Sequence, residues 1–187
     1  KTAYEIMPSL VGSEMCIRDR DQCIGCKACM YSCPVGAITE AREAIGRIYT
    51  GEGHGIKLVT GELLAGRKES SILVAELLNY VRLIQKDYDA VIIDTAAGTS
   101  CEVIRALMES KLALAVTEPT PFGAHDLRVI LELARELGTP AKVVLNKSGI
   151  ASDEEIIGIA EEFSTSVVGK IPYDKTFQES YSKGEPV

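Results

Sequence analysis

The chain has 187 residues, a formal net charge of −7 and 46% apolar residues, which is enough for one domain of ordinary size and a small module. This acidic balance argues against nucleic acid as a partner, because no basic face offsets it. No apolar run approaches the roughly 20 residues that a membrane helix needs, so we expect no membrane span. In chain order, the first segment lacks the long apolar centre of a signal peptide.

The two ends of the chain differ in character from its middle. The stretch "SLVGSEMCIRDR" resembles translated read-through of a sequencing adapter, so we expect residues 1–20 to be a non-native tail and the natural sequence to begin near Asp21. An ordinary N-terminal arm is the alternative. The other end stops at "SKGEPV" without a closing element, and we therefore expect the chain to be a fragment.

Four cysteines follow the tail, and their spacing is that of bacterial ferredoxins. Cys23, Cys26 and Cys29 stand two residues apart, and Cys33 lies three residues further on, before a proline. Such thiolates hold a 4Fe–4S cluster, and the fourth cysteine serves the other cluster in two-cluster ferredoxins. Zinc is the alternative metal, although zinc sites usually pair two separated Cys-x2-Cys knuckles. With one motif present, we expect half of a reciprocal pair, in a reducing cytoplasm.

The next segment predicts a ribbon and a helix. Two short runs rich in β-branched or apolar residues, Arg47–Thr50 and Ile56–Thr60, predict an antiparallel ribbon that turns through Gly51–Gly55. From Glu69 onward, apolar residues recur at helical spacing, and they predict an amphipathic helix.

The remainder alternates between strands and helices. The expected strands are the run in "DAVIIDTAAG" that ends in Asp94, "LALAVTEP", "AKVVLNK" and "TSVVGKIP". The expected helices are "TSCEVIRALMES", "AHDLRVILELAREL", "SDEEIIGIAEEF" and "DKTFQESYSKG". This pattern predicts the α/β class, with a doubly wound, mostly parallel sheet that has helices on both faces. Ligands bind beyond the carboxyl ends of such strands. Those ends carry Asp94, Thr117–Glu118–Pro119, Asn146–Lys147 and Ile171–Pro172.

One strand end carries a candidate phosphate-sensing pair. Asp94 ends an apolar run, and Gly98 follows four residues later, before a helix. An aspartate there can hold magnesium through water or orient an attacking water, and a glycine lets a backbone amide approach a terminal phosphate. The alternative is an ordinary strand-to-helix turn, with Asp94 as a capping or salt-bridging residue.

Several motifs together resemble a known family. The cysteine run, "DTAAGTSC", "TEPTPFG", "VVLNKSG" and "GKIPYD" follow one another in order. From Asp21 to the C-terminus the chain is similar to MinD/Mrp-like P-loop ATPases, in particular those with a two-cluster ferredoxin module inserted in the ATPase fold. The resemblance implies ATP and Mg²⁺ as cofactors beside the 4Fe–4S cluster, and a homodimer formed through the nucleotide face.

The resemblance also implies roles for single residues. Asp94 and Gly98 would sense the terminal phosphate, with Thr95 beside them. Asn146 would read the adenine edge, and Pro172 would pack near the base.

Two departures from the family are visible. Ala96 and Ala97 stand where the family often has paired prolines, which loosens the loop before the glycine. No G-x4-G-K-S/T phosphate loop occurs in the 187 residues; "GELLAGRKESS" has the glycine spacing, but Arg67 replaces the lysine and Lys68 the hydroxyl residue. Lost upstream sequence would explain both missing pieces, the phosphate loop and the first cysteine motif. We expect this chain neither to hydrolyse ATP nor to bind it well.

These observations give a domain plan and a leading function. We expect a tail at 1–20, a ferredoxin-like half module with its return ribbon at 21–62, and an ATPase core at 63–187. The leading function is an ATPase coupled to a 4Fe–4S module, with a redox partner or an apo iron–sulfur protein as its client. A non-catalytic electron-transfer protein and an iron–sulfur carrier or scaffold are the alternatives. Cys101 is expected to be a small packing residue or a redox-sensitive thiol.

Overall fold

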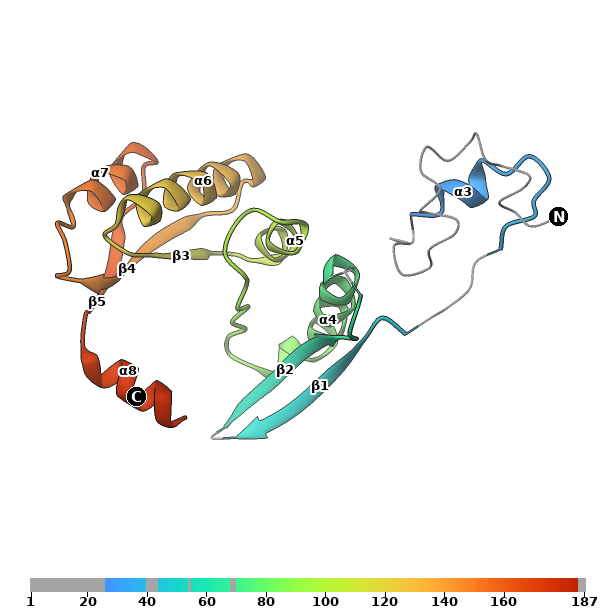
Figure 1. Cartoon of the computed structure of the whole chain (residues 1–187), viewed down its shortest axis with the longest axis horizontal. Helices are drawn as coiled ribbons and strands as arrows, with labels where there is room; N and C mark the ends of the chain where they lie inside the picture. The colour runs from blue at the N-terminus through green and yellow to red at the C-terminus, as the bar shows by residue number, and fades with distance from the viewer. Residues whose placement is uncertain (1–25, 40–43, 54, 68–69, 185–187) are drawn as a thin grey trace. The chain divides into compact units, whose positions relative to one another are not determined.

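The chain forms two compact units, residues 1–91 and residues 92–187, and each is described by itself (Figure 1). The computed structural model describes residues 26–39, 44–53, 55–67 and 70–184. Our predicted domain boundaries at residues 20 and 62 stay a prediction. The helix that follows the ribbon belongs to the first unit together with it.

The first unit contains a short helix, an antiparallel ribbon and a longer helix. Its elements are α3 (Ala28–Tyr31), β1 (Gly46–Gly53), β2 (Ile56–Leu63), α4 (Ser70–Ile84) and the short 3₁₀ helix η2 (Gln85–Asp87). The register pairs Gly46 with Leu63 and Gly53 with Ile56. The predicted ribbon and the predicted helix are therefore both confirmed. The predicted turn at Gly51–Gly55 is too long, because residues 51–53 continue β1 and pair with β2.

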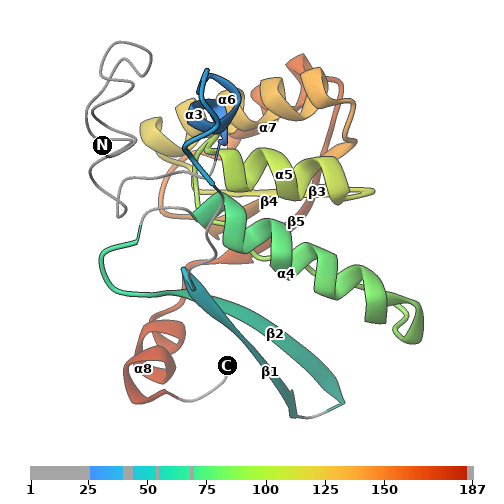
Figure 2. The ribbon, with the colours of Figure 1, turned by 90° about the vertical axis from the view of Figure 1, so that its right-hand side faces the viewer.

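Two glycines of the ribbon let α4 lie close to it (Figure 2). A Cβ atom on Gly61 would lie 3.1 Å from Leu73 Cγ and 3.2 Å from Leu77 Cδ1, and one on Gly46 would lie 3.1 Å from Leu73 Cδ1. Side chains at these positions would separate the two layers, because packed interiors have no spare room. The predicted apolar stripe of α4 thus faces the ribbon.

The second unit alternates helices and strands around a parallel sheet. Its elements are α5 (Cys101–Glu109), β3 (Ala113–Thr117), α6 (Pro121–Leu137), β4 (Ala141–Ser148), α7 (Glu154–Glu162), β5 (Val167–Pro172) and α8 (Lys175–Lys183). The strands pair in the order β3-β4-β5, and both pairings are parallel. The α/β class predicted from the sequence is confirmed.

The core of this unit lies between the sheet and two helices. Val143 and Leu145 on β4 are 0% exposed, and they pack with Leu127 and Leu131 of α6 and with residues of α7. Figure 1 shows α6 and α7 side by side along the sheet. Strand residues that alternate with the buried ones point to the opposite face. There Leu114, Val116 and Val168 are 58%, 63% and 56% exposed, and helices on that second face stay a prediction.

The predicted buried strand before Asp94 is wrong. Residues 90–96 carry no strand assignment, and Ile92 is 92% exposed. A parallel strand needs a neighbour to accept and donate its ladder hydrogen bonds. Among the described residues, no strand pairs with this run, so the apolar residues stay outside the sheet.

Candidate functional site

The cysteine segment surrounds the short helix α3. Cys26 precedes the helix, Cys29 lies within it, and Cys33 follows it. All three are free thiols, Cys26 exposed and the other two partly buried. Cys23, the first predicted ligand, lies outside the described residues.

The sulfur of Cys33 lies in a loop that surrounds it with amide donors. The backbone N–H of Ala37 donates to Cys33 Sγ at 3.2 Å. Partial desolvation raises the pKa of the Cys33 thiol, but amides of the loop, that of Ala37 foremost, outweigh it and hold the pKa below its ordinary value. Gly36 has a φ of 60°, which favours glycine at this point of the loop. Such a loop stabilises a thiolate, which is the form that binds iron.

The donor chemistry of this segment fits an iron–sulfur cluster. Three thiols stand within eight residues, and hydrogen bonds to the sulfurs are a usual feature of cluster sites. Within the described ranges, however, no group of three or more Cys, His, Asp or Glu side chains is arranged to hold a metal ion. The structure therefore places Cys26, Cys29 and Cys33 on one short segment without bringing them together around a metal position.

The predicted phosphate-sensing residues lie in the irregular run before α5. Asp94, Thr95 and Gly98 are all exposed. Gly98 has a φ of 98°, a conformation that strongly favours glycine. No hydrogen bond or ion pair of the described residues joins Asp94 or Thr95 to the sheet, so their role in sensing phosphate stays a prediction.

The carboxyl ends of the three parallel strands form one edge, as expected for parallel strands. At the end of β3, Thr117 Oγ1 donates to the carbonyl of Gly123 at 2.8 Å, while Gly123 N–H donates to Thr120 Oγ1 at 3.1 Å. Thr120 is the N-cap of α6, and Pro121 is its first residue, a combination that starts helices well. These bonds fix the first turn of α6 against the end of β3.

Residues 146–149, which we name the edge turn, are the last three residues of β4, where its pairing with β5 is irregular, and Gly149, which follows the strand. The side-chain Oδ1 of Asn146 accepts the backbone N–H of Lys147 at 3.0 Å. Because only the amide oxygen can accept an N–H, the NH₂ group of Asn146 is left for other partners. Lys147 has a φ of 54°, a left-handed conformation that costs a non-glycine residue roughly 1–2 kcal/mol.

The carboxylate of Glu118, the residue directly after β3, reaches the edge turn on one side. Lys147 Nζ lies 2.6 Å from Glu118 Oε1, and the two side chains are 42% and 36% exposed. An ion pair this exposed contributes about 0–1 kcal/mol to stability. This contribution is no larger than the cost of the left-handed conformation of Lys147. The ion pair alone therefore does not explain why Lys147 adopts that conformation.

A second carboxylate reaches the edge turn from the start of α7. Ser148 Oγ donates to Asp153 Oδ2 at 2.9 Å, and Lys170 Nζ of β5 lies 2.8 Å from the same oxygen. The hydrogen bonds from Lys170 and Ser148 lower the pKa of Asp153. Asp153 Oδ1 is inaccessible and has no hydrogen-bond partner among the described residues. Asp153 is the N-cap residue of α7, yet its side chain makes no capping bond to that helix.

The end of β5 completes the edge. Pro172 pairs with Ser148 in the register of β4 and β5, and Tyr173 N–H donates to the carbonyl of Ser148 at 3.1 Å. The carboxylate of Asp174 accepts the N–H of Thr176, which lowers the pKa of Asp174 and caps α8. The structure thus brings two predicted residues, Asn146 and Pro172, to one edge.

Sequence reasoning missed the charged residues around the edge turn. The sequence places Glu118 and Lys147 at strand ends without a role, and it places Asp153 only within the expected helix "SDEEIIGIAEEF". Lys170 carries no local signal at all, because it meets Asp153 only through the parallel pairing of β4 and β5.

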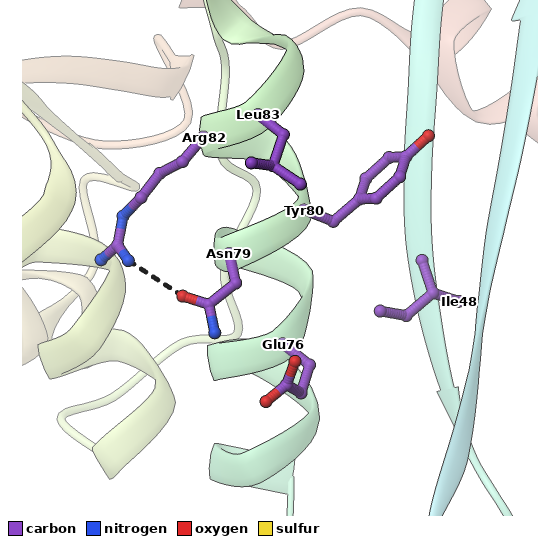
Figure 3. Close-up of a pocket in the computed structure, with 6 residues that line it drawn as sticks. All are labelled: Ile48, Glu76, Asn79, Tyr80, Arg82 and Leu83. Carbon is purple, nitrogen blue, oxygen red and sulfur yellow. Dashed lines mark hydrogen bonds between the residues drawn. The ribbon is translucent and has the colours of Figure 1, made fainter.

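A groove in the first unit was also not predicted (Figure 3). Ile48 of β1 and five residues of α4 line it: Glu76, Asn79, Tyr80, Arg82 and Leu83. Arg82 Nη1 donates to Asn79 Oδ1 at 2.9 Å, and the ring of Tyr80 lies toward the ribbon. The lining contains no cysteine or histidine, so the groove offers no ligand set for a cluster.

Comparisons with known proteins support the cysteine interpretation. The profile of the 4Fe–4S binding domain family matches residues 16–39. An uncharacterized protein of Methanocaldococcus jannaschii is 39% identical over 165 residues, which is 88% of this chain and 56% of that protein. Two uncharacterized ATP-binding proteins of the same organism are 33% identical over 132 residues (67% of this chain, 52% of the relative) and 30% identical over 120 residues (63% and 46%).

The chain spans about half the length of the curated relatives it matches. The 4Fe–4S profile supports binding of an iron–sulfur cluster, and the ATP-binding relatives suggest a nucleotide site. Of the helices described, none is both long enough and apolar enough to cross a bilayer.

Proposed function

We propose that this chain is part of an iron–sulfur-cluster-binding ATPase of the MinD/Mrp type, in which ATP binding and hydrolysis are coupled to a 4Fe–4S module. The observation that carries the proposal is the ferredoxin spacing of the cysteines together with the amide-lined sulfur of Cys33. The ATP half rests on the names of two relatives, on the motifs at the strand ends, and on the polar residues gathered at the edge turn.

The cysteines would hold the cluster through their thiolates. Cys23, Cys26 and Cys29 are the proposed ligands of one cluster, and Cys33 is the proposed fourth ligand of another. A bound 4Fe–4S cluster supplies one-electron redox chemistry. The loop that lowers the pKa of Cys33 favours its thiolate before any iron arrives.

The nucleotide would bind at the carboxyl edge of the sheet. Asn146 is proposed to donate its NH₂ group to the base, and Pro172 to pack near the base. Asp94, with Thr95 beside it, is proposed to hold magnesium through water or to orient the attacking water. Gly98, with its φ of 98°, would let its amide approach the terminal phosphate. The phosphate loop itself would belong to a part of the protein beyond these 187 residues.

The assembly and location follow from the same proposal. The protein would form a homodimer through its nucleotide face, and its client would be a redox partner or an apo iron–sulfur protein. Thiolate ligands on an exposed segment are preserved in a reducing compartment, which supports a cytoplasmic location as part of the proposal.

ATP turnover by a longer protein that contains this chain and a phosphate loop tests the proposal. Asp94→Asn should lower the turnover rate about 100-fold or more, a size typical of removing one group that acts on the transition state, while Asp89→Asn, five residues earlier, should leave it unchanged. Equal rates in the two variants would contradict the role of Asp94. Turnover above background by the 187-residue chain alone would contradict the proposal that the phosphate loop lies elsewhere.

Two other functions make different predictions. An electron-transfer protein would show reversible low-potential reduction whether or not nucleotide is present. A carrier or scaffold would transfer its cluster to an apo-protein, and the cysteine segment, whose Cys26 is exposed, is compatible with such transfer.

A further inference from the structure

The edge turn (residues 146–149) is held from two sides by carboxylates that come from different elements. Glu118, which directly follows β3, contacts Lys147, and Asp153, at the start of α7, contacts Ser148. Asp153 also binds Lys170 of β5. Lys147 and Ser148, the two residues that follow Asn146, therefore each contact a carboxylate from a different element at the sheet edge.

Neither a strong ion pair nor a helix cap accounts for these contacts. Glu118 and Lys147 are more than one third exposed, so their attraction is screened by water. Asp153 stands where it could cap α7, but its carboxylate is used on the edge turn instead, and one of its oxygens is left inaccessible and without a partner among the described residues.

The backbone of the edge turn has an unfavourable conformation that surrounding contacts must hold in place. Lys147 adopts a left-handed conformation, with Gly149 at a φ of 96° two residues later. Strained non-glycine residues persist only where surrounding contacts over-determine them, and they gather at ligand sites. The backbone N–H of Lys147 also donates to Asn146 Oδ1, and this bond decides which end of the Asn146 amide remains available.

We propose that Glu118 and Asp153 are positioning residues that hold the edge turn so that Asn146 presents its NH₂ group to a hydrogen-bond acceptor on the ring of a bound nucleotide. The proposal rests on the proposed function for the nature of the ligand. Glu118 and Asp153 thereby receive a role. The proposal predicts that they affect binding of the base without affecting binding of the phosphate.

Binding of AMP and of ribose 5-phosphate to a longer ¹⁵N-labelled protein that contains this chain and a phosphate loop, followed by NMR, separates these two parts of the ligand. Glu118→Gln and Asp153→Asn remove one charge each with little change of shape. Each should weaken AMP binding about three- to tenfold, the effect of losing one hydrogen bond, and should leave ribose 5-phosphate binding unchanged. Asn146→Ala should weaken AMP binding at least as much.

Two matched controls accompany these variants. Glu162→Gln removes the ion pair with Arg128 between α7 and α6, and Asp174→Asn changes a carboxylate that caps only its own helix. Neither residue contacts the edge turn, so both controls should bind AMP within about twofold of the parent. The side-chain amide signals of Asn146 should shift in Glu118→Gln and Asp153→Asn but not in the controls.

The outcomes separate this inference from the proposed function. AMP binding by both positioning variants that equals the parent, or an equal loss for AMP and ribose 5-phosphate, would overturn the positioning role. A parent protein, with its phosphate loop, that shows no AMP-dependent change at the edge turn would instead refute the proposed nucleotide site. In that case the Asn146 signals decide: unchanged signals in the two variants overturn the positioning role, and shifted signals support it.

Discussion

Asp153 links three elements through one carboxylate oxygen, which accepts hydrogen bonds from Ser148 and from Lys170. Its place in "SDEEIIGIAEE" predicts a helix start, and α7 does begin at Glu154. The direction of its side chain could not be predicted, because both of its partners lie on neighbouring strands rather than on its own helix. The local sequence predicts that Asp153 caps α7. What its carboxylate contacts depends instead on the tertiary pairing of β4 with β5.

Asp153 should make stability depend on pH in the acid range. Its pKa is lowered in the folded chain by Lys170 and Ser148, so its contribution is complete above the unfolded pKa of about 3.9. The contribution is lost as the pH falls through the lower folded pKa. Urea unfolding at several pH values should show a fall in the free energy of unfolding in this range, and Asp153→Asn should make the fall shallower. An identical pH dependence in the variant would show that the carboxylate is not ion-paired.

Cys33 is the last cysteine of the predicted cluster motif, and its role as a ligand stays a prediction. The spacing and the following proline predict a ligand, and the structure adds that Ala37 N–H donates to its sulfur. The assignment of Cys33 to a second cluster stays a prediction, since it depends on a cysteine motif that these 187 residues do not contain.

Among the elements, the first turn of α6 is built around a glycine. A Cβ atom on Gly123 would lie 2.9 Å from Thr117 Oγ1 and even closer to the carbonyl oxygen of Glu118. The motif "TEPTPFG" was recognised from the sequence as a family resemblance. The structure gives a physical reason for the glycine in this motif, because α6 comes close to the end of β3 there.

Gly123→Ala should therefore destabilise the second unit by about 1–3 kcal/mol, the usual cost of overpacking. Gly158→Ala is the matched control, because Gly158 lies in α7 with open space where its Cβ would be. There alanine should stabilise the helix by up to about 1 kcal/mol. Circular dichroism during urea unfolding measures both changes. A neutral or stabilising Gly123→Ala would mean that β3 and α6 are not as close as described.

The element predictions succeeded where the signal was local. The ribbon, α4, and the alternation from α5 to α8 were all predicted, because periodicity and turn residues specify them. The run before Asp94 failed for a different reason. Its apolar residues match a buried strand, but a strand forms only beside another strand, and none among the described residues pairs with it.

At the scale of the whole molecule, the chain combines a cysteine unit and an α/β unit that the structure describes separately. The relatives it matches are about twice as long as the part it covers. A complete nucleotide site would need a phosphate loop, and a complete pair of clusters would need a second cysteine motif. Neither occurs in the 187 residues. We therefore predict that this chain alone binds nucleotide poorly and does not hold a complete pair of clusters.

Iron stoichiometry after anaerobic reconstitution tests whether the cysteine run is half of a reciprocal pair. The 187-residue chain should bind substoichiometric iron, or form an unstable cluster with three thiolate ligands, and Cys29→Ser should abolish that binding whereas Cys101→Ser should not. A stable cluster with about four irons per chain would contradict the account. It would mean that Cys16, Cys33 or Cys101 closes the site within the same chain.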